Sequence, residues 1–154
     1  MKLIRKSGEG IILHLGNKEK ELFCAVLQCY PRMPRGHQRL ARPGQVPDGE
    51  EAQRLLDEAL DYLRTDSKKY LSSLLSEQSG RLRRQGEGWA LEVRAEDMEL
   101  ILGILNDVRV GSWVLLGSPE GRITHLSADT APNVWAMEMA GYFQMHLLSA
   151  AQDR

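Results

Sequence analysis

The segment from Ala95 to Leu116, AEDMELILGILNDVRVGSWVLL, constrains the fold most, because it reads as one long helix with apolar residues on almost every side. At about 100° of rotation per residue, its main apolar stripe centres on Leu105. The opposite side is not strongly polar either, since it carries Asp107 with Gly103, Val110, Gly111 and Val114. Glycine is unfavourable inside a helix, so Gly103 and Gly111 predict the close approach of another element. A helix of this kind is buried between layers or lies at a contact between subunits. The sequence therefore predicts that more than one face of this helix is covered.

The last helix has the same property. The pattern predicts that it begins after a Thr130 cap, with Pro132 in its first turn, and runs to about Ala150. One stripe of this helix is centred on Gly141, and the opposite side is also apolar. We therefore expect the outer faces of the last two helices to form a protein contact, with a homodimer as one form of it.

The rest of the chain predicts an α+β fold that is mainly α. Residues 2–6 and 11–15 are β-prone runs joined by a glycine-containing turn, and residues 89–93 alternate as in a half-buried strand. Helical spacing continues over residues 18–30 and from Glu50 onward, where Thr65 or Asp66 is expected to cap a separate second helix. The prediction is a single domain, residues 1–154, of four to five helices and about three antiparallel strands.

Composition excludes several classes of protein. The apolar fraction of 42%, the charged fraction of 27% and the formal net charge of −1 are those of an ordinary globular protein. No apolar run reaches the roughly 18 residues of a membrane span, and Ile11–Leu15 is too short for a signal peptide. Cys24 and Cys29 point in different directions on a helix and suit a reducing compartment. We therefore expect a cytoplasmic protein without a membrane partner.

Polar residues interrupt the long helix at Asn106, Asp107 and Arg109. Arg109 falls about 40° from Leu105, inside the main apolar stripe. A guanidinium buried without a partner costs several kcal/mol, which predicts an ion pair with a carboxylate of another helix, Glu138 first. The alternative is that Arg109 and Asn106 line a pocket that binds an anion, as in a small-ligand-binding protein or an enzyme. Asp107 and Arg109 are two residues apart and do not face each other, so they do not form a catalytic pair.

Motifs for catalysis, metals and nucleotides are missing from the sequence. The four histidines have no metal-ligand spacing, and no glycine-rich phosphate loop or nucleophile motif occurs. We therefore predict no catalytic residue, no cofactor and no metal site. The absence of motifs does not exclude an enzyme.

Two arginine clusters are the main positive feature. They occupy a long irregular loop and a polar segment before the predicted strand, and no aromatic residue accompanies them as a stacking platform. Nucleic-acid binding is therefore the weaker interpretation, beside an acidic protein surface or a role in solubility. The clusters comprise Arg32, Arg35, Arg39 and Arg42, and Arg81, Arg83 and Arg84.

The stretch AEDMELILGILNDVRVGSWVLLG resembles a bacterial domain-of-unknown-function family that is best represented in actinobacteria. The sharpest likeness is the leucine–asparagine–aspartate–any–arginine segment at Leu105–Arg109, followed by a tryptophan-containing C-terminal helix around Trp135–Leu148. The resemblance implies no catalytic residues. Genes of that family often lie beside the adaptor of the Clp protease, which implies a regulatory or protein-quality role.

Together these observations predict a non-enzymatic cytoplasmic module for protein interaction or regulation. Small-ligand binding near Arg109 and nucleic-acid binding through the arginine-rich loops remain the alternatives.

Overall fold

The computed structural model describes residues 1–37, 39, 48–121, 123 and 126–152. Its helices are α1 (Asn17–Gln28), α2 (Gly49–Leu75), α3 (Met98–Leu115) and α4 (Ala131–Gln152), with short 3₁₀ turns at Glu77–Ser79 and Ala95–Asp97. Its strands are β1 (Lys2–Ser7), β2 (Gly10–Leu15), β3 (Leu82–Gln85) and β4 (Gly88–Arg94). The prediction of a mainly α, α+β fold is confirmed.

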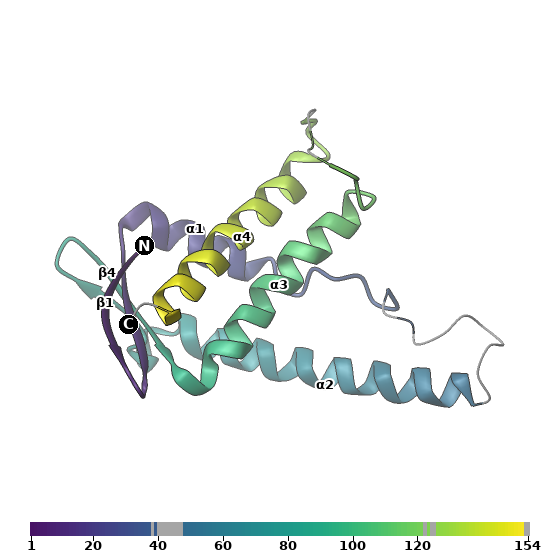
Figure 1. The fold of residues 1–154 in the computed structure, drawn as a ribbon, viewed down its shortest axis with the longest axis horizontal. Coiled ribbons are helices and arrows are strands. Elements are labelled where there is room, and N and C mark those ends of the chain that lie inside the picture. The colour runs from purple at the N-terminus through teal and green to yellow at the C-terminus, as the bar shows by residue number, and fades with distance from the viewer. Residues whose placement is uncertain (38, 40–47, 122, 124–125, 153–154) are drawn as a thin grey trace.

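The strands form one antiparallel sheet in the order β1-β2-β4-β3. Pairing of β2 with β4 places Leu13 opposite Leu91 and Ile11 opposite Val93, and all four side chains are buried. Since successive strand residues point to opposite faces, these residues form one apolar face of the sheet. The helices pack on this face, as Figure 1 shows.

The strand β3 was not predicted. It lies in the arginine-rich segment that sequence reasoning assigned to a loop, and it adds a fourth strand to the three expected. It pairs only with β4, so it forms an edge of the sheet, and of its four residues only Leu82 is buried. An edge strand with charged, exposed side chains has little of the apolar alternation by which strands are recognised.

The helix α2 is continuous, so the predicted break at Thr65–Ser67 is wrong. The Thr65 hydroxyl donates a hydrogen bond of 2.9 Å to the carbonyl oxygen of Asp61, one turn earlier in the same helix. A hydroxyl bonded in this way does not act as an N-cap, since a cap accepts from the amides of the following turn. Figure 1 shows α2 extending far beyond the sheet and the other helices.

The core joins α1, α3, α4 and the sheet. Phe23 of α1 meets Phe143 of α4 edge to face, with ring centroids 5.0 Å apart, and both rings are fully buried. The central residues of α3 complete this core: Ile101, Ile104, Leu105 and Val108. In Figure 1, α1 crosses behind α4 and α3, which leaves the other side of this helix pair without a covering element of the described chain.

Candidate interaction surface

The helices α3 and α4 pack side by side in antiparallel directions (Figure 1). Each buries one side in the core: α3 with residues such as Leu105 and Val108, and α4 with Ala136, Ala140 and Phe143. We call the opposite side of this pair the outer face. It comprises Arg109 and Trp113 of α3 and Val134, Met137, Glu138, Gly141, Met145 and Leu148 of α4.

Apart from Arg109 and Glu138, the side chains of the outer face are apolar. The side chains of Trp113, Met145 and Leu148 are 39%, 59% and 44% exposed. Across the 22 residues of α4, Glu138 is the only acidic or basic residue other than His146. Surface helices ordinarily carry charged residues opposite their buried side, so this composition is typical of a helix that a second protein covers.

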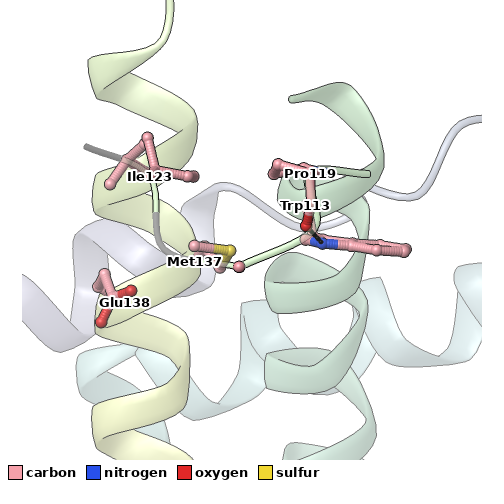
Figure 2. A pocket seen from close by; sticks show the side chains of 7 residues that line it. Trp113, Pro119, Ile123, Met137 and Glu138 are labelled. Carbon is pink, nitrogen blue, oxygen red and sulfur yellow. Dashed lines mark hydrogen bonds between the residues drawn. The ribbon is translucent and has the colours of Figure 1, made fainter. Parts of the chain in front are cut away.

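A pocket of about 450 Å³ lies at one end of the outer face, between α3, α4 and the chain that follows α3. Figure 2 shows Trp113 on one wall, Met137 between the helices and Glu138 at the side. The indole nitrogen of Trp113 donates a hydrogen bond of 3.2 Å to the carbonyl oxygen of Pro119, which holds this chain against the ring. The lining residues are Trp113, Pro119, Gly121, Ile123, Val134, Met137 and Glu138.

The chemistry of this pocket fits an apolar group with a basic neighbour. Trp113, Ile123 and Met137 offer apolar and aromatic contact, and methionine adapts its shape to what it meets. Glu138 is the single ionisable side chain of the lining, and it is exposed. An anion would therefore meet a carboxylate rather than an arginine here.

Arg109 does not occupy the place predicted for it. The buried residues of α3 extend from Leu105 toward Ile104 and Gly111, so the centre of the buried side lies about 100° from Arg109. Arg109 and Glu138 are both exposed, and the described part of the chain has no ion pair between them. The expected buried pair is therefore wrong.

The prediction that Arg109 and Asn106 line an anion-binding pocket is also wrong. Asn106 is exposed, and neither it nor Arg109 lines the pocket that Glu138 lines. The side chain of Arg109 instead lies along α4, where its Nε and Cδ atoms are 3.8 and 3.9 Å from the position of a β-carbon at Gly141.

Asp107 and Gly111 are the residues of this segment that the fold uses. The Asp107 Oδ1 atom accepts hydrogen bonds from the backbone amides of Arg32, at 2.6 Å, and Met33, at 3.2 Å. One turn later, a β-carbon at Gly111 would lie 2.5 Å from the Met33 nitrogen and the Arg32 carbonyl carbon. The polar insertion in α3 thus holds the chain that follows α1, and the predicted close approach is real at Gly111. A β-carbon at Gly103, by contrast, would have no described atom within 4 Å beyond its own helix backbone.

The arginine clusters mostly contact oxygen atoms of their own chain. The side chain of Arg32 donates to Asn133, Arg35 pairs with Asp61 at 3.4 Å, and Arg84 donates to Asn17 at 2.9 Å. Arg81 pairs with Asp97 at 2.8 Å, and Arg83 pairs with Glu92 at 3.3 Å. Arg39 is exposed, and Arg42 lies outside the described residues. The three pairs with carboxylates reduce the positive charge that a nucleic-acid backbone would meet, whereas the contacts with asparagine leave the charge of Arg32 and Arg84 in place.

Metal-binding and membrane-spanning features are not found in the described residues. Among them, no group of three or more histidine, cysteine, aspartate or glutamate side chains is arranged to hold a metal ion. No helix in that part of the chain is long and apolar enough to cross a membrane.

Sequence reasoning foresaw the outer face but not its pocket. The apolar stripe of α4 is visible from residue spacing alone, whereas the pocket depends on the path of the chain after α3, which has no periodic pattern.

In comparisons with known proteins, no family model, curated protein or solved structure matches this chain.

Proposed function

We propose that this protein is a non-enzymatic interaction module that binds another protein through the outer face of α3 and α4. The observation that carries the proposal is the composition of α4, whose exposed side holds Met145 and Leu148 and whose only acidic residue is Glu138. Association is driven mainly by burial of such apolar surface, with a few large side chains contributing most of the affinity.

The partner's chemistry follows from the pocket. An apolar side chain of the partner occupies the space beside Trp113 and Met137, and a lysine or arginine of the partner lies near Glu138. Tryptophan is among the residues that most often dominate binding at interfaces, so Trp113 is the expected centre of the contact.

Affinity capture with matched variants tests this proposal. A tagged Met145→Glu chain places a charge on the outer face at a residue that is 59% exposed, so folding is expected to be unaffected. The control is Ile4→Glu, which changes a residue of similar exposure, 47%, on β1. We expect a partner that the wild type and the control retain and that Met145→Glu loses.

Charge reversal at Glu138 tests whether a lysine or arginine of the partner lies near this residue. Glu138→Lys should weaken capture of the same partner, whereas Glu138→Gln should weaken it less, because it removes the attraction without adding repulsion. If Met145→Glu and Glu138→Lys both retain every partner of the wild type, the outer face is not the binding surface.

The same variants test the prediction, made from the sequence, that the protein is a homodimer. If the outer face joins two copies, Met145→Glu halves the mass measured by light scattering, while Ile4→Glu does not.

A further inference from the structure

A cleft of about 470 Å³ lies between the middle of α2 and the chain that follows α1. In Figure 1 this chain leaves α1, passes α3 and continues above α2. The described residues that line the cleft include three cationic side chains, Arg35, Arg64 and Lys68, and a single carboxylate, Asp61. With three positive charges against one negative, the lining is basic, although the chain as a whole has a net charge of −1.

Arg64 is the least exposed of the three cations, and the backbone fixes its position. Its side chain is 17% exposed, and its guanidinium donates a hydrogen bond of 3.1 Å to the carbonyl oxygen of Met33. A guanidinium has five N–H groups in a rigid fork, which suits the oxygen atoms of a phosphate or a carboxylate. Since Met33 takes one of these groups, Arg64 keeps further donors for a group bound in the cleft.

Asp61 neutralises the two arginines only loosely. It lies 3.4 Å from Arg35 and 3.7 Å from Arg64, whereas charge-assisted hydrogen bonds ordinarily measure about 2.7–2.9 Å. The side chains of Arg35 and Asp61 are 79% and 51% exposed, so water screens their attraction. Lys68 is exposed and makes no ion pair or hydrogen bond with the described residues. The cleft therefore keeps positive charge that this part of the chain does not neutralise.

The charge and the shape of the cleft define its ligand. A phosphomonoester carries up to two negative charges at neutral pH and has three acceptor oxygens, which matches a lining of three cations and one carboxylate. Pro31 and Met33 line the same cleft and offer apolar contact to an organic group. The volume of about 470 Å³ is within the range of small-molecule sites, about 300–1,000 Å³, and leaves room for more than a phosphate ion.

We propose that this cleft binds a small organic phosphomonoester. The phosphate lies among Arg35, Arg64 and Lys68, and the organic part lies against Pro31 and Met33. The site is separate from the outer face and does not rest on the proposed function.

Calorimetric titration of the full chain with phenyl phosphate tests the site, because this probe joins a phosphate to a flat apolar ring. We expect saturable binding of one molecule per chain. Inorganic phosphate, which lacks the ring, and benzoate, which has the ring but only one negative charge, should each bind several-fold more weakly. Absence of saturable binding by phenyl phosphate, or equal binding of either analogue, would overturn the proposal.

A phosphotyrosine peptide separates a small ligand from a phosphorylated protein. A short peptide that contains this residue carries the same aryl phosphate, but most of its chain would lie outside the cleft. It should therefore bind no more tightly than phenyl phosphate. Tighter binding of the peptide would assign the phosphate to a protein partner and contradict the proposal.

Two adjacent lysines of α2 give matched variants. Lys68 lines the cleft, whereas Lys69 pairs with Asp66 at 3.8 Å and is not part of the lining. Lys68→Gln should weaken the binding of phenyl phosphate by about fivefold, the effect of losing one exposed ion pair. Lys69→Gln removes the same charge from a side chain that is 75% exposed and should leave the affinity nearly unchanged. Equal effects of the two variants would mean that the overall charge of α2 attracts the probe, which contradicts a site in the cleft.

Asp61→Asn provides the opposite test. Loss of the carboxylate makes the lining more positive and releases the two arginines, so phenyl phosphate should bind several-fold more tightly. Folding is expected to be unaffected, because the side chain of Asp61 is 51% exposed, and circular dichroism checks this. Unchanged or weaker binding by the folded variant would show that the probe does not meet Arg35 and Arg64, and it would overturn the proposal.

Discussion

Asp107 and Gly111 explain why α3 carries polar and small residues within an apolar helix. They lie one turn apart on the same side, where the carboxylate accepts two backbone amides and the glycine leaves room for the chain at Arg32 and Met33. Amides in this half-buried place need acceptors, because buried donors without partners are costly. The segment therefore supports the structure by holding the chain that follows α1.

Alanine at two glycines of α3 should have opposite effects. Gly111→Ala should lower the free energy of unfolding by about 1–3 kcal/mol, because its β-carbon would overlap backbone atoms that do not move easily. Gly103→Ala should raise it by about 1 kcal/mol, because the site is open and alanine favours a helix. Urea denaturation of both variants measures the two changes. A stabilising effect of Gly111→Ala would show that the chain at Arg32 is not held against α3.

Removal of the Asp107 carboxylate should also destabilise the protein. Asp107→Ala should lower the free energy of unfolding by about 2 kcal/mol, since hydrogen bonds to charged groups contribute about 1.5–3 kcal/mol. Asp107→Asn keeps an oxygen that can accept from Arg32 and should cost less. Thermal unfolding of the two variants checks this order, and equal losses would contradict the role assigned to the oxygen.

Tyr70 should make stability fall in alkaline solution. Burial, and then the negative charge of Asp97, raises the pKa of Tyr70 to about 12. Since tyrosine in the unfolded chain has a pKa of about 10, the unfolded state loses its proton first, and stability falls between about pH 10 and pH 12. Tyr70→Phe should reduce this fall. Its cost at neutral pH should be small, because the buried hydroxyl has no hydrogen-bond partner among the described residues.

The control for this prediction is Tyr62→Phe, which changes a tyrosine that is 68% exposed. Denaturation at about pH 8 and about pH 11, on either side of the ordinary tyrosine pKa, gives the comparison. If the two variants lose the same stability between these conditions, Tyr70 does not carry the effect.

At the level of elements, the sequence was most informative where helices bury a long periodic stripe. Residue spacing located α3, α4 and the hairpin of β1 and β2, because burial imposes a period on the side chains. It failed at β3, where one buried leucine stands among exposed arginines, and at Thr65, whose hydroxyl bonds within the helix. In both places the polar residues suggested a loop or a helix cap, and the apolar pattern was too weak to indicate otherwise. The structure there depends on tertiary packing, which residue spacing does not show.

Proline at position 66 should distinguish a continuous α2 from two helices. In a helix that began after a Thr65 cap, proline at 66 would occupy the first helical position and be tolerated. In the continuous helix it removes a hydrogen bond and clashes with the preceding turn, so Asp66→Pro should cost about 3 kcal/mol or more. Glu50→Pro, in the first turn of α2, is the control and should cost little. A similar small effect of both variants in urea denaturation would favour the two-helix arrangement.

At the level of the whole molecule, the outer face is a largely apolar surface that the described chain does not bury. Sequence reasoning anticipated this surface, because two neighbouring helices are apolar on almost every side. It placed Arg109 wrongly, because the core buries the side of α3 that extends from Leu105 toward Ile104 and Gly111, away from Arg109.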